Sequence, residues 1–537
     1  MKKAPYRLYI LATTLVVVGV GIGFFVQPVI SGDSVMDQTR KFSDVLSMAV
    51  KNYVEDVDTQ KLTEAAIKGM LDELDPHSVY ITAKDMQKVE EEFRGSFDGI
   101  GVEFDVVNDT VTVVSPIIGG PSEALGILAG DKIVKINDTT AIKLTRETVP
   151  KKLRGPKGTV VKLHIKRAGE KDLLVFDVTR DKIPMNSVDA SFMIDGTDVG
   201  YITANRFSAT TYDELMRAAE NLRSQGMKKL LLDLRYNPGG YLDQAFRIAD
   251  ELIPPGKKLV YTKGRRAEFD EDFWSTEGGT LENIPLIVLI NGGSASASEI
   301  VSGAVQDLDR GLVVGETSFG KGLVQRQYPL GDGSAFRLTI SRYYTPSGRL
   351  IQRPYSDKAK YYGGEGREEG EEGDNIDHNA DDSTNKRPKF KTAGGRTVYG
   401  GGGITPDYIV KQDTIGFLAR NLRAKNLFWE TADNVMRSRG KDIRAQYGSD
   451  ITRFLREFAI GQADIDIMKS LAKTKNVEWK DNEFAQDAEY IKLVVKAYIG
   501  RSVFNNNGYT AVMLSMDKQV KKALTLFPEA AKIAKLR

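Results

Sequence analysis

The chain carries, from Leu286 to Glu299, the stretch LIVLINGGSASASE, in which a fully apolar run passes into a turn of glycine and serine. Five consecutive apolar residues are typical of a strand that is buried on both faces by covering helices. Ser296 to Glu299 then matches a capping box, with Ser296 as the helix N-cap and Glu299 at the third helical position. The stretch therefore predicts a buried strand that turns directly into a helix at about residues 298–308.

Strand and helix patterns also alternate on the N-terminal side of this stretch. We expect strands at 200–203 and 229–234, and amphipathic helices at 212–224 and 241–252. Continuous apolar strands separated by helices are typical of an α/β core built on a mostly parallel sheet. The expected core runs from residue 188 to residue 357.

Two strand-to-helix turns of this core are candidate reaction sites, because ligands tend to bind at the carboxyl ends of parallel strands. The first is DLRYNPGG, from Asp233 to Gly240, whose paired glycines allow a substrate to approach the backbone closely. The second holds Ser294, Ser296 and Ser298, any of which could present a hydroxyl beside the N–H groups of a helix N-terminus. Spacing alone does not choose among the three serines, and a purely structural role fits both turns.

A lysine lies between two glycines in SFGKGLVQ, from Ser318 to Gln325. Burial of this residue, Lys321, would favour its neutral amine, lower its pKa and allow it to act as a base. The G-K-[ST] pattern of a phosphate-binding loop is absent, so the sequence does not indicate a nucleotide site here. A solvated loop lysine is the plain alternative.

The whole chain of 537 residues contains no cysteine and only three histidines, His77, His164 and His378. This composition excludes disulfides, cysteine-based zinc sites and a thiol nucleophile, and it predicts neither a metal site nor a cofactor. We interpret the histidines as structural or solvated, so a hydrolase would use Lys, Asp or Glu for proton transfer. Lys and Arg number 75 against 73 Asp and Glu, and this net charge of +2 predicts no nucleic-acid partner.

The N-terminus carries the pattern of a membrane segment. Three basic residues among the first seven precede an uncharged run from Leu8 to Ile30, which as a helix would be long enough to span a bilayer. The basic flank predicts that the N-terminus stays inside and that the rest of the chain lies outside the cytoplasm. We expect residues 1–31 to be a single-pass anchor, with a long cleaved signal peptide as the alternative.

Two further segments separate this N-terminus from the core. Residues 35–94 show the helical spacing of apolar residues, and residues 95–183 hold short β-rich runs between turn clusters, as in a small β domain. This domain opens with a glycine loop before a strand, where successive N–H groups could hold a C-terminal carboxylate while a peptide adds as an extra strand. The loop consists of Gly99, Ile100, Gly101 and Val102.

After the core the composition changes twice. Residues 358–392 are acidic and glycine-rich, which predicts a flexible loop, and residues 393–412 hold a second glycine-rich segment that completes the core. Residues 413–537 return to helical spacing, with apolar stripes within 451–458 and 491–498. We interpret these stripes as packing faces within a helical domain.

In this order the motifs resemble the C-terminal processing, or tail-specific, serine peptidases of the bacterial envelope. The resemblance covers residues from about 37 to 407 and rests on the Gly99 loop, the Arg154-Gly155-Pro156 turn, the Asp233–Gly240 turn, the serine segment and the Lys321 loop. It implies a multidomain α+β protein in which a PDZ domain precedes an α/β (crotonase/ClpP-like) peptidase core. Helical N- and C-terminal regions would flank these two domains. The resemblance assigns no role to the helical region after Gly403.

The resemblance also implies roles for individual side chains. The middle serine of the segment is the family's nucleophile, which selects Ser296. The family's base lies on a glycine-flanked loop about 25 residues later, which selects Lys321, and a glutamine one turn on, Gln325, orients this lysine. Such a Ser/Lys dyad needs neither cysteine nor histidine.

Backbone groups are implied in the same way. The N–H groups of Ala297 and Gly240 would form the oxyanion hole, although Gly239 could replace Gly240 in this role. The loop from Gly99 to Val102 would bind the carboxylate of the substrate tail.

The implied activity is that of an endopeptidase that cleaves proteins near accessible C-termini, in the bacterial inner membrane with its catalytic region on the periplasmic or extracytoplasmic side. Occupancy of the PDZ domain could open or block the cleft. Whether the chain forms a homo-oligomer or binds an adaptor protein stays open. An inactive PDZ-containing scaffold of the envelope is the main alternative, and a crotonase-like enzyme acting on a thioester is a weaker one.

Overall fold

The computed structural model describes residues 34–117, 119–276, 278–363, 373–374 and 387–536, and the chain divides into two compact units after Tyr80. The first unit holds helices α2 (Val35–Asn52) and α3 (Thr59–Asp72). In the break after α3, the His77 N–H donates to Asp75 Oδ1 over 2.8 Å, which fits a structural role for this segment. Strand β1 (Val79–Ile81) spans the division between the units.

The expected membrane segment, Leu8 to Ile30, lies outside the described residues. Among the helices that the structure does describe, none combines the length and the hydropathy that a bilayer span requires.

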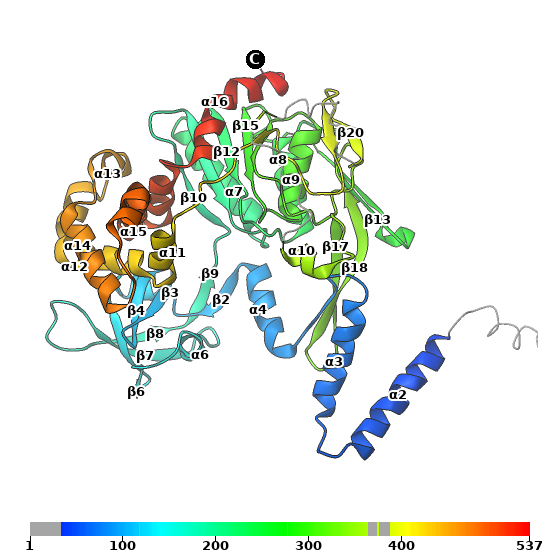
Figure 1. Ribbon diagram of the computed structural model, residues 1–537, viewed down its shortest axis with the longest axis horizontal. Coiled ribbons are helices and arrows are strands. Elements are labelled where there is room, and N and C mark those ends of the chain that lie inside the picture. The colour runs from blue at the N-terminus through cyan, green and yellow to red at the C-terminus, as the bar shows by residue number, and fades with distance from the viewer. Residues whose placement is uncertain (1–33, 118, 277, 364–372, 375–386, 537) are drawn as a thin grey trace, which may run out of the picture. The chain divides into compact units, whose positions relative to one another are not determined.

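A small β domain follows helix α4 (Ala83–Arg94) in the second unit (Figure 1). Its sheet has the strand order β3-β4-β5-β7-β8, with β6 paired to β5, and a ribbon of β2 and β9 connects it to the core. Strand β3 is therefore an edge strand. The elements are β2 (Ser96–Gly99), β3 (Val102–Val107), β4 (Thr110–Pro116), α5 (Pro121–Ala124), β5 (Lys132–Ile136), β6 (Thr139–Thr140), α6 (Thr148–Leu153), β7 (Val160–Lys166), β8 (Leu174–Thr179) and β9 (Asp181–Pro184).

The core is built on a sheet with the order β10-β11-β12-β15-β16-β22-β19, which is parallel from β11 to β22 and antiparallel at both edges. The predicted strands and helices of this region are confirmed to within a few residues. Its strands are β10 (Val188–Met193), β11 (Val199–Ala204), β12 (Lys229–Asp233), β15 (Leu286–Ile290), β16 (Leu312–Gly315), β19 (Gly373–Asp374) and β22 (Tyr408–Ile409).

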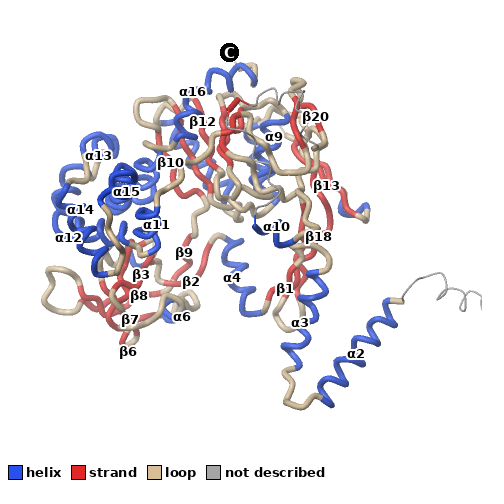
Figure 2. Tube along the Cα trace, viewed as in Figure 1, coloured by secondary structure: helices blue, strands red, loops and turns tan. Residues whose placement is uncertain are grey.

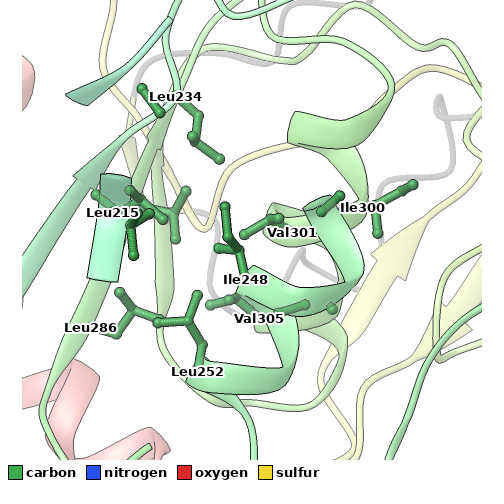
Figure 3. Packing of buried hydrophobic residues seen from close by; sticks show 14 of the residues in the cluster. Leu215, Leu234, Ile248, Leu252, Leu286, Ile300, Val301 and Val305 are labelled. Carbon is green, nitrogen blue, oxygen red and sulfur yellow. The ribbon is translucent and has the colours of Figure 1, made fainter. Parts of the chain in front are cut away.

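Helices cover both faces of this sheet because alternate strand residues point to opposite sides. Leu286 and Val288 pack against helices α7 (Thr211–Ser224), α8 (Leu242–Leu252) and α9 (Ala297–Asp307), as Figure 3 shows for part of this core. Ile287 and Leu289 pack instead against helix α16 (Lys518–Ile533). Helix α16 is therefore part of the packing of the core.

A second sheet, in which β17 pairs with β18, β18 with β13 and β13 with β14, all antiparallel, was not predicted from the sequence. Its strands are only partly buried and carry charged residues, so they lack the continuous apolar runs that mark the parallel strands. The bounds are β13 (Lys258–Gly264), η1 (Ala267–Phe269), β14 (Glu271–Trp274), β17 (Leu323–Pro329) and β18 (Ala335–Tyr344).

The helices between residues 417 and 514 form a helical domain, shown in yellow to orange-red in Figure 1 and among the blue helices of Figure 2, whereas the rest of the expected C-terminal helical region, α16, packs on the core. The predicted apolar stripes pack inside it, where Phe454, Ile491 and Val495 are buried. Its helices are α11 (Phe417–Ala424), α12 (Leu427–Tyr447), α13 (Ile451–Glu457), α14 (Gln462–Thr474) and α15 (Asp481–Leu514). The segment between core and domain holds α10 (Lys358–Gly363), β20 (Lys389–Lys391) and β21 (Thr397–Tyr399).

Candidate active site

A cleft of about 1120 Å³ lies at the carboxyl ends of the parallel strands. It brings together both strand-to-helix turns and the lysine loop that the sequence singled out. No histidine lines it in the described part of the chain. Its lining includes Phe93 and Arg94 of α4, residues 205–209, residues 238–243, Ser296, Ala297, Lys321 and Gln325.

The three candidate serines differ in their surroundings. Ser294 and Ser298 are fully buried, and their hydroxyls donate to the carbonyl oxygens of Leu234 at 2.8 Å and Asn237 at 2.9 Å. Ser296 is half-buried, lines the cleft and precedes helix α9 with a φ of +54°. A left-handed φ is uncommon outside glycine and often marks a functional site. Burial and hydrogen bonding therefore favour Ser296 as the serine that presents its hydroxyl to the cleft, whereas spacing alone did not choose among the three serines.

Glu299 ties the serine turn to the lysine loop. Its carboxylate is fully buried and accepts the N–H of Ser296 at 2.7 Å, the N–H of Lys321 at 2.9 Å, the N–H of Gly320 at 2.7 Å and the hydroxyl of Ser318 at 2.5 Å. Burial raises the pKa of Glu299, and these four hydrogen bonds oppose the rise. The sequence identified Glu299 only as a capping residue, because contacts made about 20 residues away leave no local signal.

We expect Glu299→Ala to lower the free energy of unfolding by about 3–5 kcal/mol, because buried N–H groups of both loops lose their shared acceptor. Urea unfolding measures this loss. Activity should also fall in the folded fraction, because the backbones of Ser296 and Lys321 are no longer tied together. Glu220→Ala, at an exposed position of α7, is the control, and an equal loss of stability in both variants would contradict the role of Glu299.

The lysine loop places Lys321 half-buried at the cleft, where its Nζ donates to Gln325 Oε1 over 3.0 Å. Gln325 lies on β17 beside a register shift between Val324 and Gln325 in the pairing with β18. Such a bulge redirects the side chains around it. In this way the geometry brings the glutamine to the lysine amine.

The paired glycines lie against the serine turn. A Cβ on Gly239 would come within 2.8 Å of Ser296 Cβ, and one on Gly240 within 2.1 Å of the carbonyl oxygen of Phe207, so neither position has room for a side chain. The N–H of Gly239 donates to Asn237 Oδ1 at 2.9 Å. Among the described residues, the N–H groups of Gly240 and Ala297 have no hydrogen-bond partner. Of the two glycines, Gly240 is therefore the one whose N–H is available to a ligand.

The glycine loop of the β domain precedes the edge strand β3. Ser122 fixes it by donating its N–H at 3.1 Å and its hydroxyl at 2.6 Å to the carbonyl oxygen of Ile100. The carbonyl of Gly101 accepts the N–H of Ile117 at 2.9 Å, and Gly101 itself has a φ of +73°. Within the part of the chain that the structure describes, the N–H groups of Ile100 and Gly101 donate to no protein acceptor.

One ion pair joins this domain to the wall of the cleft. Arg154 Nη1, in the turn that follows α6, lies 2.5 Å from Glu91 Oε2 on α4. The same helix contributes Phe93 to the cleft, where its ring meets the ring of Tyr241 edge-to-face at 4.8 Å. Helix α4 thus contacts both the β domain and the Asp233–Gly240 turn region, which the sequence pattern did not predict.

Four family models match separate parts of the chain. Residues 198–356 match peptidase family S41, and residues 99–178 match the PDZ domain. Residues 27–85 match the N-terminal domain of the activating protease CtpB. Residues 418–505 match a family of unknown function.

Similar proteins include a carboxy-terminal-processing protease of Bartonella bacilliformis, which is 41% identical over 59% of this chain and 73% of its own length. The carboxy-terminal processing protease CtpB of Bacillus subtilis is 36% identical over 60% of this chain and 66% of its own. Among solved structures, a photosystem II D1 C-terminal processing protease is 29% identical, with a TM-score of 0.34 over 57% of this chain and 82% of its own.

Proposed function

Because the chain belongs to the carboxy-terminal processing proteases of peptidase family S41, which are serine-type peptidases, we propose that it cleaves proteins near their C-termini with a Ser296/Lys321 dyad. The observation that carries this proposal is the meeting of Ser296 and Lys321 in one cleft. Their backbones share the buried carboxylate of Glu299 as an acceptor. The cleft therefore offers a hydroxyl and an amine on two loops whose backbones are tied together.

In this mechanism, Ser296 Oγ attacks the scissile carbonyl while the neutral amine of Lys321 accepts its proton. Gln325 orients that amine through the hydrogen bond to its Oε1. Lys321 then protonates the leaving amine, and water hydrolyses the acyl-enzyme with the same lysine as base.

The negative charge that develops on the carbonyl oxygen needs hydrogen-bond donors. The N–H groups of Ala297 and Gly240 are our candidates, because both residues line the cleft and the Gly239 N–H is already bound to Asn237. In serine peptidases, each lost donor of this kind lowers kcat by about 100- to 1000-fold.

Substrate tails would bind to the PDZ domain. The Gly99–Val102 loop would hold the terminal carboxylate through the N–H groups of Ile100 and Gly101, and the peptide would pair with the open edge of β3. Hydrogen bonds to a charged group contribute about 1.5–3 kcal/mol each, which corresponds to about a 10- to 100-fold change in affinity.

We therefore expect a protein substrate with a free C-terminal carboxylate to be cleaved with a kcat/KM about 10- to 100-fold higher than the same substrate amidated at its C-terminus. Gly101→Ala should remove this preference, because a Cβ at its φ of +73° meets Ile183 Cδ1 at 3.1 Å and distorts the loop. Gly119→Ala is the matched control, since Gly119 has a φ of +76° but no neighbour within 4 Å. An amidated tail that is cleaved as fast as a free one would contradict the role of the loop.

A further inference from the structure

A second cavity, of about 1140 Å³, lies between the core and the helical domain. Thr203 and Asp233 line it on the core side, where they pair in register at the carboxyl ends of the parallel strands β11 and β12. Three tyrosines of helix α15 line it on the other side. They are Tyr490, Tyr498 and Tyr509.

The second cavity adjoins the catalytic cleft. Asn205 lines the cleft, and Asp189, whose pKa is raised by burial and lowered in part by the nearby Asn205 side chain, lines the second cavity. Asp189 stands at a register shift in the pairing of β10 with β11, and such bulges redirect side chains next to active sites. In the turn after β12, Tyr236 lines the second cavity and Pro238 lines the cleft. The two cavities are therefore neighbours at the carboxyl ends of β11 and β12, separated only by the residues that follow these strands.

Tyr236 is the most unusual residue on this path. Its φ is +60°, a left-handed conformation that is strained for a bulky residue but ordinary for Asn or Gly. The backbone is held there by the N–H bond to Asn291 Oδ1 at 2.9 Å and by Gly293, where a Cβ would approach Tyr236 Cα to 2.9 Å. The residue is 67% exposed, so core packing does not explain a tyrosine at this position, and its hydroxyl donates to Oε1 of Gln412, another residue of the cavity lining, at 2.9 Å. An exposed aromatic ring held under strain beside a catalytic turn points to a use for the ring.

Much of the charge in the second cavity is neutralised internally. Arg235 pairs with Asp233 at 2.5 Å and with Asp517 at 2.7 Å, and Lys518 pairs with Asp413. The tyrosine rings, together with apolar lining residues such as Leu493 and Met513, then remain as surface that can contact a ligand. Tyrosine rings give large, rigid contact area with a polar end, which suits binding of a polypeptide without strict sequence selection.

We propose that this second cavity is an extended substrate subsite. It binds a segment of unfolded polypeptide beyond the residues that flank the scissile bond, with Tyr236 as the contact on the core side and the tyrosines of α15 opposite. The helical domain thereby becomes a wall of the substrate-binding surface. This inference rests on the proposed function, because it takes the cleft as the place where polypeptides are cleaved.

The test compares two substrates: β-casein, which is unfolded and long, and an internally quenched octapeptide that copies one of its cleavage sites and fills only the cleft. For Tyr236→Asn, the ratio of kcat/KM for β-casein to kcat/KM for the octapeptide should fall about 10-fold. The free energy of unfolding should rise or stay equal, because Asn tolerates the left-handed φ. Thr510→Trp, which fills the cavity from α15, should lower the ratio similarly. Lys535→Asn is the control, because Lys535 has a φ of +54°, is exposed and lies outside the cavity lining.

An unchanged ratio of kcat/KM in Tyr236→Asn and Thr510→Trp would overturn the subsite. An equal loss of kcat/KM for both substrates would overturn it as well, because that result would indicate damage to the catalytic turn. Binding gives a readout that does not need catalysis. In the Ser296→Ala background, fluorescently labelled β-casein should bind about 10-fold more weakly when Tyr236 is also Asn, measured by anisotropy. If Ser296→Ala still cleaves β-casein, the proposed dyad is wrong, but the binding comparison still tests the subsite.

Discussion

Ser296→Ala is expected to lower kcat for a tailed protein substrate by about 10⁴-fold or more, because the variant has no hydroxyl to form the acyl-enzyme. The fold should be retained, since Ser296 is half-buried and lines an open cleft rather than the core. Single-turnover cleavage followed by mass spectrometry measures the residual rate. Circular dichroism and the urea midpoint establish that the protein is still folded.

The neighbouring serines are the matched controls for this result. Ser294→Ala and Ser298→Ala each remove a buried hydroxyl that donates to a backbone carbonyl, so each should lower the free energy of unfolding by about 1–3 kcal/mol. The folded fraction of both should keep most of its activity. Wild-type-like cleavage by Ser296→Ala, or complete loss only in Ser294→Ala or Ser298→Ala, would contradict the assignment of the nucleophile.

Lys321→Ala is expected to lower kcat by about 10³-fold or more, because no histidine among the described residues lines the cleft to replace the lysine as a base. A general base acts in its unprotonated form, so wild-type kcat should rise with pH on its acid side. That rise should vanish in Lys321→Ala. The full pH profile of kcat for both proteins measures the effect.

Lys321→Arg separates basicity from charge, because arginine keeps the positive charge but does not lose its proton. This variant should be as inactive as Lys321→Ala. Lys257→Ala, an exposed lysine outside the cleft, should behave as wild type. Activity within 10-fold of wild type in Lys321→Arg would rule out a role of Lys321 as the base.

The parallel core was predictable because its strands are buried on both faces. Residues 286–290 are entirely apolar, and all five are buried in the structure. The second sheet was missed because β17 and β18 form a partly exposed ribbon whose charged residues hide the strand pattern. The helical domain was predicted as such, but the packing of α16 against the core sheet is a contact between distant parts of the chain.

The catalytic candidates were predictable for a different reason. Ser296, Lys321 and Gln325 were selected by resemblance of short motifs, and the structure gathers all three in one cleft. The roles of Glu299 and Tyr236 could not be predicted, because one depends on hydrogen bonds between loops and the other on a backbone angle. The membrane anchor at Leu8 to Ile30 stays a prediction, which fractionation of cells that express the full chain would test.

The most direct test of the central claim is covalent labelling with a fluorophosphonate, followed by peptide mass mapping of the adduct. A serine activated by Lys321 should carry a single adduct, on Ser296 and not on Ser294 or Ser298. The rate of labelling should fall by about 10³-fold in Lys321→Ala, in parallel with kcat. An adduct on another serine, or labelling of Ser296 that is equally fast without Lys321, would contradict the Ser296/Lys321 dyad.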